Sequence, residues 1–321
     1  MEGMEMKKLT NILALLLVVL LVLPVGAQAA QLIPGGQLVG LELHNNTITI
    51  AAFDDNSPAK LAGLQVGDQI THIDHTPINS PQQIRSLLKS APAQIEIQFL
   101  RKGQAKTLTF SPRASGAPLG IYLKQGITGV GTLTYYDPAT GKFGALGHCV
   151  SDQQGNLLNM TDGSAYDAHV MTVKKGKSGT PGQIVGAMET GFFGRLYKNL
   201  PQGVFGNVQT PLTGTPIETA SAEQVHTGPA TIRSTVTDDG VQDYSVKILK
   251  IYPASRSGGR NMLIKITDQR LLDTTGGIVQ GMSGSPIIQD GKLVGAVTHV
   301  LVNDPTMGYG IFIENMLGAA A

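Results

Sequence analysis

The chain has 321 residues, which is enough for about two domains and excludes a single small module. Apolar residues make up 41% of it, and 24 Lys and Arg offset 23 Asp and Glu to a net charge of +1, so the composition supplies a core and argues against a nucleic-acid partner. The 40 glycines favour tight turns and short strands, and the single cysteine, Cys149, excludes an intramolecular disulfide and a Cys-based zinc site.

Residues 1–30 predict an export signal or a membrane anchor. Lys7 and Lys8 precede the uncharged apolar run at 12–23, and a small-residue segment typical of signal-peptide cleavage follows at 27–29. The apolar run is shorter than the roughly 20 residues that cross a bilayer. Cleavage is therefore favoured, with a single retained anchor as the alternative, and the rest of the chain is expected to work outside the cytoplasm.

Residues 31–111 predict a first, β-rich domain with two short helices. Alternating apolar residues indicate strands at 38–43 and 47–50, separated by a polar turn. Ser57 is placed to cap a short helix that ends near Gly63.

A second helix and a further strand follow in this first domain. The helix is expected to begin at Ser80, because apolar residues then recur at helical spacing through Leu88. Residues 95–99 alternate as a strand does.

The Ala-Gly-Leu-Gln-Val-Gly-Asp segment at 62–68 is followed by an Ile-x-x-Ile strand. With these motifs, residues 38–110 resemble a PDZ domain of the bacterial, protease-associated kind. The resemblance implies that an extended peptide adds to a sheet edge, with its terminal carboxylate held by backbone N–H groups of the preceding loop. The loop would consist of Leu38, Val39, Gly40 and Leu41. A closed groove that only packs on its neighbour is the alternative.

A small-residue linker is expected at 112–118, and residues 119–321 predict a second domain that is almost entirely β. Only the terminal segment 313–317 has a helical pattern. An all-β barrel or pair of barrels follows, because closed barrels leave no exposed strand edges. The clearest strand patterns lie at 129–135, 168–173, 183–188, 244–251, 262–266 and 292–299.

Two segments of this second domain predict a serine nucleophile and its base. Ser283 stands between glycines, just before a β-branched run, and glycine at 281 and 284 lets the backbone turn so that the N–H groups of Gly281 and Ser283 converge on an oxyanion. A serine hydroxyl needs a nearby base, and His148, which follows a predicted strand, is the candidate. Asp268, at the end of the predicted strand 262–266, is the candidate acid that orients the imidazole.

Each of these residues also fits a structural role when taken alone. A Gly-x-Ser-Gly segment occurs in ordinary hairpins, and aspartates at strand ends usually make turns. His299, sixteen residues after the serine, competes with His148 as the base or shapes the substrate pocket, and Asp152 competes with Asp268 as the acid. The order His, Asp, Ser nevertheless favours catalysis.

The segment Gly-Gly-Ile-Val-Gln-Gly-Met-Ser-Gly-Ser-Pro at 276–286 is followed by Gly-Ala-Val-Thr-His-Val at 295–300 and Asn-Asp-Pro at 303–305. In these segments the second domain resembles the SpoIVB peptidase family of endospore-forming bacteria. The resemblance implies a serine endopeptidase with a signal or membrane segment, a PDZ domain and a trypsin-like double β-barrel. It assigns Ser283 as nucleophile, His148 as base and Asp268 as orienting acid.

The same resemblance implies a signalling role. Members of the family act in the space between mother cell and forespore, cleave themselves near the N-terminal segment, and cleave a membrane-bound regulator, which leads to activation of a sigma factor. Protein or peptide substrates are expected, and no cofactor, metal or nucleic acid. The alternative from another class is a non-catalytic, PDZ-containing scaffold or binding protein of the cell envelope.

Overall fold

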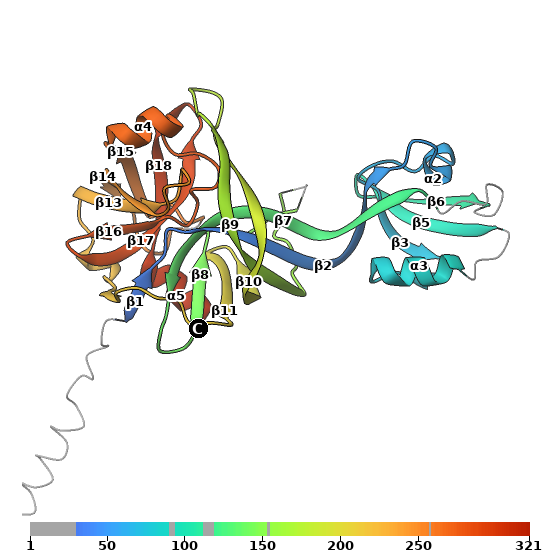
Figure 1. The fold of residues 1–321 in the computed structure, drawn as a ribbon, viewed down its shortest axis with the longest axis horizontal. Coiled ribbons are helices and arrows are strands. Elements are labelled where there is room, and N and C mark those ends of the chain that lie inside the picture. The colour runs from blue at the N-terminus through green and yellow to red at the C-terminus, as the bar shows by residue number, and fades with distance from the viewer. Residues whose placement is uncertain (1–29, 90–93, 112–118, 153–154, 257) are drawn as a thin grey trace, which may run out of the picture. The chain divides into compact units, whose positions relative to one another are not determined.

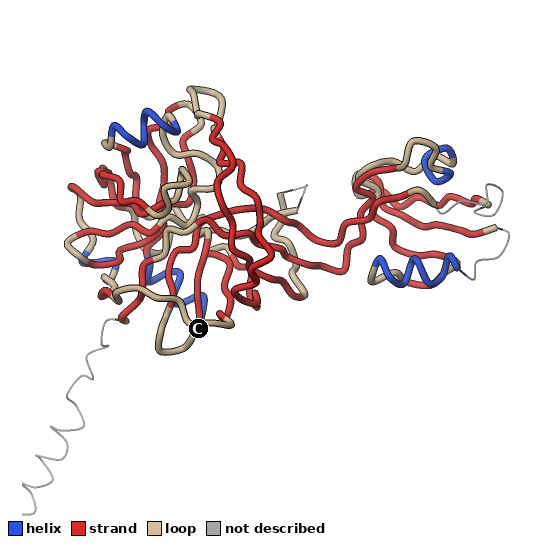
Figure 2. The backbone as a smooth tube through the Cα atoms, viewed as in Figure 1, coloured by secondary structure: helices blue, strands red, loops and turns tan. Residues whose placement is uncertain are grey.

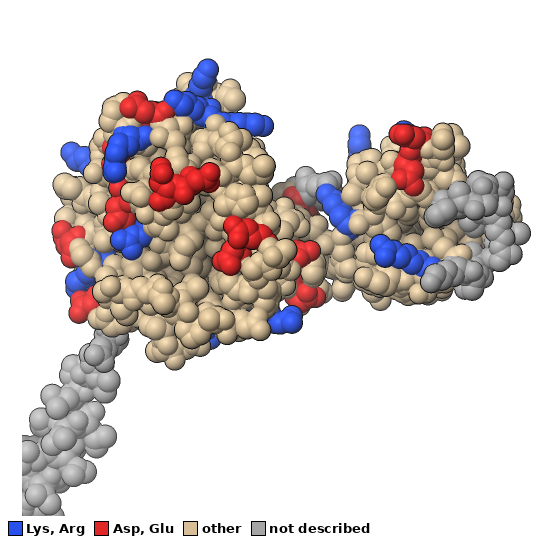
Figure 3. Space-filling model, viewed as in Figure 1, with Lys and Arg blue, Asp and Glu red and all other residues tan. Residues whose placement is uncertain are grey.

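The computed structural model describes residues 30–89, 94–111, 119–152, 155–256 and 258–321. The predicted export segment at 1–30, apart from Ala30, and the predicted linker at 112–118 lie outside the described residues. Strands dominate the described chain, as Figure 2 shows, so the expectation of a mainly β protein is confirmed. On the face drawn in Figure 3, basic and acidic side chains both occur among many uncharged ones.

Six antiparallel strands form the first barrel (Figure 1). They follow one another in the order β7, β8, β11, β10, β9 and β2, and a further pairing between β2 and β7 closes the ring. Leu41, Phe143 and Val204 are among the side chains buried inside it. The strands are β2 (Leu38–Phe53), β7 (Ile121–Tyr136), β8 (Lys142–Ala145), β9 (Asp162–Lys174), β10 (Gln183–Leu200) and β11 (Gly203–Val208).

The second barrel is also closed and antiparallel, in the order β13, β14, β15, β18, β17 and β16. Its strands alternate as the sequence predicts: in β14, Tyr244 and Val246 are buried while Ser245 is exposed. The predicted double β-barrel is therefore present. The strands are β13 (Gly228–Ser234), β14 (Gln242–Ile251), β15 (Met262–Ile266), β16 (Pro286–Gln289), β17 (Lys292–Leu301) and β18 (Asp304–Phe312).

Short elements join and cover the barrels. Strand β1 (Gln31–Pro34) pairs with β7 and with β12 (Ile217–Glu218), and η2 (Ala222–Gln224) follows β12. The predicted terminal helix is α5 (Ile313–Ala320), which contacts β17 and β18. The helix α4 (Gln269–Thr275) was not predicted, because seven residues are too few to show a helical period. Among the described residues, no helix is both long and apolar enough to cross a membrane.

The PDZ domain has its own core, separate from those of the barrels. Both predicted helices form: Ser57 Oγ accepts from the N–H of Lys60, and Ser80 Oγ accepts from that of Gln83. The domain consists of the second part of β2, α2 (Pro58–Leu61), β3 (Gln69–Ile73), β4 (Thr76–Pro77), α3 (Pro81–Lys89), β5 (Ile95–Arg101), β6 (Gln104–Phe110) and the first part of β7.

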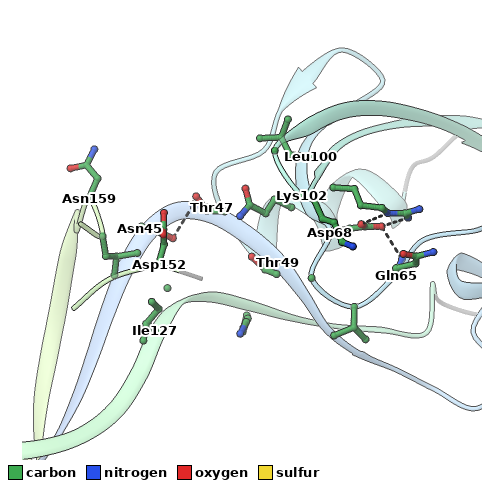
Figure 4. Close-up of a pocket in the computed structure, with 18 of the residues that line it drawn as sticks. Asn45, Thr47, Thr49, Gln65, Asp68, Leu100, Lys102, Ile127, Asp152 and Asn159 are labelled. Atoms are coloured by element: carbon green, nitrogen blue, oxygen red, sulfur yellow. Dashed lines mark hydrogen bonds and ion pairs between the residues drawn. The ribbon is translucent and has the colours of Figure 1, made fainter. Parts of the chain in front are cut away.

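An ion pair between a buried carboxylate and a partly exposed arginine lies within the PDZ domain. Asp68, which is 1% exposed, accepts from Gln65 N at 2.8 Å and receives two hydrogen bonds from the guanidinium of Arg101, at 2.6 and 2.7 Å. Figure 4 shows Asp68 and Gln65 side by side at the wall of a pocket. Asp152, the alternative candidate acid, lines this pocket, whereas Ser283, His148 and Asp268 do not.

The boundary of the PDZ domain differs from the prediction. Residues 38–43 of β2 pair with residues 127–132 of β7 and, through 39–43, with β9, so they belong to the first barrel. Only the second part of β2, from Ile48, pairs within the PDZ domain. The PDZ domain is therefore an insertion between two neighbouring barrel strands.

The polar segment expected to be a turn is a bulge in a continuous strand. Leu43 faces Ile127, and the next paired residue of β2, Ile48, faces Gln125. Residues 44–47 of β2 therefore lie opposite the single residue 126 of β7. Such a bulge leaves residues unpaired without ending the strand. A polar triplet between two apolar runs looks the same in sequence for a bulge and for a turn.

Candidate active site

The loop that carries Ser283 runs from the end of α4 to the start of β16. Gly281 and Gly284 have φ of +102° and +97°, a region that side chains rarely allow. A Cβ atom on Gly284 would also lie 2.1 Å from the carbonyl oxygen of Thr132. Both glycines that the sequence singled out are thus required by the backbone path.

This loop is fastened to the first barrel through Thr132 of β7. The Thr132 hydroxyl donates to the carbonyl of Gly281 at 2.7 Å, and the Thr132 N–H donates to the carbonyl of Ser283 at 3.0 Å. On the other side, Gly284 N–H donates to Val297 O of β17 at 2.7 Å. Ser283 therefore lies where the two barrels meet.

Two backbone N–H groups of the serine loop lack an acceptor among the described residues. The N–H groups of Gln280, Met282 and Gly284 are all hydrogen-bonded. Those of Gly281 and Ser283 have no acceptor in the described part of the chain. Pairs of free N–H groups of this kind can stabilise an oxyanion in acyl transfer.

His148 follows β8 after a tight turn in which Leu146 and Gly147 both have positive φ. Its Nδ1 lies 2.8 Å from the carbonyl oxygen of Cys149. Because a carbonyl can only accept, Nδ1 carries the proton and Nε2 is left as the acceptor. Burial lowers the pKa of His148 below its usual value, although the Cys149 carbonyl opposes this, so the ring is neutral at neutral pH.

Thr298 is the common neighbour that brings the serine and the histidine segments together. Ser283 Oγ donates to the carbonyl oxygen of Thr298 at 3.0 Å. Gly147 packs on the same residue, since a Cβ atom there would lie 2.9 Å from Thr298 Cγ2. The next residue, His299, places its ring 5.5 Å from that of His148, centroid to centroid.

His299 is a second neutral imidazole at this point. Its pKa is lowered to about 4 by burial and, to a smaller extent, by the charges of His148 and Arg260. Its Nδ1 is buried and has no hydrogen-bond partner within the described chain. Unlike His148, it has no contact that fixes its tautomer.

Comparisons with known proteins place the chain in a family. The family model of the SpoIVB peptidase S55 matches residues 116–317, well over half of the chain. The chain belongs to the SpoIVB peptidase S55 family. It is a serine endopeptidase, and a PDZ-domain model matches residues 49–101, which agrees with a PDZ domain that begins after the first part of β2.

Other relatives are more distant or match only in part. A probable periplasmic serine endoprotease, DegP-like, from Pseudomonas savastanoi pv. phaseolicola is 42% identical over 55 residues, which cover 16% of this chain and 12% of that protein. The Rv3671c protease of M. tuberculosis in its active form is 15% identical, with a TM-score of 0.37, covering 74% of this chain and 85% of that one. The PDZ domain of the SdrC-like protein of Listeria monocytogenes is 19% identical, with a TM-score of 0.22, covering 26% and 92%.

In this SpoIVB-family peptidase, the structure does not bring Asp268 to His148. Asp268 is the N-cap of α4: it accepts from the N–H groups of Arg270 and Ser245 and from the Arg270 guanidinium. The Arg270 hydrogen bond in particular lowers the pKa of Asp268 to about 2. The expected orienting acid is thus a helix cap, the structural role that an aspartate after a strand often takes. The Cys149 carbonyl holds His148 instead.

Asp152, the competing acid, belongs to the turn after His148. Its carboxylate accepts from Asn156 N at 2.9 Å. Cys149 is half-buried, with its Sγ 3.8 Å from the Ser151 hydroxyl.

Asn199 is a supporting residue that the sequence reasoning missed. It is 7% exposed, accepts from Val150 N, and donates to the carbonyls of Val150 and Leu158. It therefore fixes the segment that follows His148 and Cys149. No clear sequence signal marked it, because Asn199 follows Lys198 in a strand that contains several other polar residues.

The predicted carboxylate-binding loop of the PDZ domain is not a loop. Leu38, Val39, Gly40 and Leu41 lie in β2, with β7 paired along one side and, from Val39 on, β9 along the other, so their backbone groups face neighbouring strands. A Cβ atom on Gly40 would lie 2.3 Å from the Met188 side chain. The prediction is wrong because residues 38–41 are the first residues of β2 itself, whereas we expected them to form a loop before an edge strand.

A different segment has the features that the PDZ resemblance requires. Leu119 is buried in the PDZ core, and Gly120 turns with φ of +62° into the start of β7. Within the described chain, residues 121–125 pair with β2 on one side only, and α3 contacts β7. The signal available in the sequence was the Leu-Gly-Ile triplet at 119–121 directly before a strand.

Proposed function

We propose that the chain is an exported signalling endopeptidase in which Ser283 is the nucleophile and His148 the general base. The observation that carries this proposal is the pair of unbonded N–H groups at Gly281 and Ser283, on a loop held in place by Thr132. In this role they would receive the negative charge of the tetrahedral intermediate.

The steps follow from the hydrogen bonds around the serine. In the proposed first step, the Ser283 hydroxyl leaves the Thr298 carbonyl, and His148 Nε2 takes its proton as Oγ attacks the peptide carbonyl. The imidazolium then gives this proton to the leaving amine, and a water molecule activated by the same Nε2 hydrolyses the acyl-enzyme. The Cys149 carbonyl fixes the tautomer of His148 as a carboxylate would, but it brings no full negative charge to the imidazolium.

We infer that the PDZ domain binds a peptide along the free edge of residues 121–125. An added strand would pair with β7, and backbone N–H groups near Leu119 and Gly120 would receive its terminal carboxylate. Membership of the SpoIVB family supports a membrane-bound sporulation regulator and the chain itself as substrates, in the space between mother cell and forespore. The periplasmic DegP-like relative supports export.

A fluorophosphonate probe tests the catalytic assignment. The wild-type protein should be labelled on Ser283, and His148→Ala should abolish the labelling while the protein stays folded. Mass spectrometry of wild type beside Ser283→Ala should show N-terminal trimming only in the wild type. A folded wild-type protein that is neither labelled nor trimmed would instead support a non-catalytic PDZ scaffold.

A further inference from the structure

The tip of the β9–β10 hairpin is hydrogen-bonded to the loop that carries Ser283. This hairpin belongs to the first barrel, and Figure 1 shows its two long strands rising beside α4 and β18. Gly176 N–H donates to Thr275 O at 2.8 Å, at the start of the serine loop. Further along, Gln280 N–H donates to Gly182 O at 2.9 Å, and Ile184 N–H donates to Gln280 O at 2.8 Å. The hairpin therefore binds both the N–H and the carbonyl of Gln280.

The hydrogen bond from Ile184 fixes the orientation of one peptide plane. In a trans peptide, the C=O and the following N–H point in opposite directions. Because the Gln280 carbonyl points to Ile184, the Gly281 N–H points away from the hairpin, where it has no acceptor within the described chain. Without this bond, the freedom of Gly281 would let the plane rotate and place a carbonyl where the N–H now stands.

Close packing supports the same contact. A Cβ atom on Gly182 would lie 2.4 Å from Lys174 O and 2.6 Å from Val279 Cγ1 of the serine loop. Ile184 is fully buried, and a Cβ atom on Gly281 would lie 2.9 Å from its Cβ. The hairpin tip and the loop thus touch with no space for a side chain at these glycines.

The hairpin tip also holds the turn between β17 and β18. Ser178 Oγ donates to Asn303 O at 2.8 Å, and Gly179 N–H donates to Val302 O at 2.9 Å. The tip is thereby anchored on two separate segments of the second barrel, which makes its position over Gln280 well defined.

We propose that the tip of the β9–β10 hairpin, residues 174–184, is a positioning element that keeps the Gly281 N–H available to the oxyanion. The inference rests on the proposed function, because it assigns a purpose to the hairpin only if Ser283 is the nucleophile. Gly182 and Ile184 act through the serine loop and do not touch the substrate.

The test compares Gly182→Val with Pro181→Val, which adds the same side chain at the exposed neighbouring position. Gly182→Val should push the tip off Val279 and lower kcat on a short peptide substrate by about 10²–10³-fold, the usual effect of losing one oxyanion donor, with KM nearly unchanged. Binding of a peptidyl boronic acid, whose oxygen occupies the oxyanion position, should weaken in parallel, while binding of the cleaved product peptide should not. Pro181→Val should behave as wild type in all three measurements.

Several outcomes would overturn the proposal. They are an unchanged kcat in folded Gly182→Val, a rise in KM alone, or equal weakening of boronate and product binding.

If Gly182→Val does not fold, Gly176→Ala provides the same comparison, because its Cβ would meet its nearest neighbour at 3.2 Å and needs only a small shift. It should show a smaller kcat loss with the same unchanged KM, and a wild-type kcat would refute the proposal. A wild-type protein that no fluorophosphonate labels would instead refute the catalytic assignment itself.

Discussion

The rings of His148 and His299 lie 5.5 Å apart, centroid to centroid, and are inclined by 40° to each other. Only His148 has an Nδ1 hydrogen bond that fixes its tautomer and leaves Nε2 as an acceptor. His299 has a buried Nδ1 with no partner in the described chain. This difference supports the proposal that His148, and not His299, is the base.

This difference predicts unequal effects of substitution. His148→Ala should lower kcat by at least about 10⁴-fold, as loss of a general base does in serine peptidases. His299→Gln should keep kcat within about tenfold, the range of a residue that only adjusts the site. Steady-state kinetics on one peptide substrate measures both, and a larger loss for His299→Gln would reverse the assignment.

The pH dependence of activity should reflect the buried environment of His148. Burial lowers its pKa, and the base must be neutral to accept the serine proton. Activity should therefore persist as the pH falls below 6.5, the ordinary value for histidine, and decline only at the lowered pKa. The acid limb of kcat/KM against pH measures this. A midpoint at or above 6.5 would contradict the described surroundings of His148.

Substitution of Asp268 distinguishes a helix cap from an orienting acid. Asp268→Asn should keep kcat within about threefold, because asparagine caps helices as well as aspartate does. Asp268→Ala should lower the free energy of unfolding by about 1 kcal/mol without changing kcat of the folded enzyme. Thermal unfolding and kinetics of both variants are the measurements. An orienting acid would instead lose about 10⁴-fold in kcat on change to Asn.

Gly40 should matter for folding of the barrel and not for peptide choice. Gly40→Glu would force a side chain into Met188 and should cost about 1–3 kcal/mol or more in stability. Gly129→Glu is the matched control, because a Cβ atom on Gly129 meets nothing within 4 Å. Thermal unfolding of the two proteins makes the comparison. Equal melting temperatures would show that β2 does not pack on β10 at this point.

The ion pair between Asp68 and Arg101 predicts the stability of the PDZ domain. Asp68→Ala leaves the Gln65 N–H without its acceptor and the Arg101 guanidinium with the Gly63 carbonyl alone, and it should destabilise the domain by about 1–3 kcal/mol. The exposed Asp55→Ala serves as the control. Hydrogen exchange of the PDZ core, measured by mass spectrometry, should accelerate only in Asp68→Ala, and equal exchange in the two variants would contradict the pairing.

Local sequence patterns predicted the positions of helices and strands well, but they did not predict which strands pair with one another. The strand expected at 262–266 is β15 residue for residue, and the Ser57 cap forms as expected. The alternation at 38–43 also indicated a strand correctly, but nothing in it says which sheet that strand joins, since pairing partners lie far away in sequence. The wrong loop assignment follows from this gap.

The sequence likewise predicted only part of the candidate site. Ser283, Gly281 and His148 could be proposed from the sequence because glycine-dependent turns and strand ends leave recognisable patterns in it. Asp268 does not join them, because an aspartate after a strand suits a helix cap and a catalytic acid equally well by pattern alone. The hydrogen bond from His148 to the Cys149 carbonyl could not be predicted, since every residue has a carbonyl.

Leu43 and Ile127 face each other across β2 and β7 at the point where the chain departs for the PDZ domain and comes back. Joining these strands by a two-residue hairpin connection would excise the whole inserted module and leave every barrel strand in its register. Insertion or deletion at this one junction would therefore add or remove the PDZ domain in ancestral forms of such an enzyme. Its regulation and its catalytic chemistry could then evolve independently.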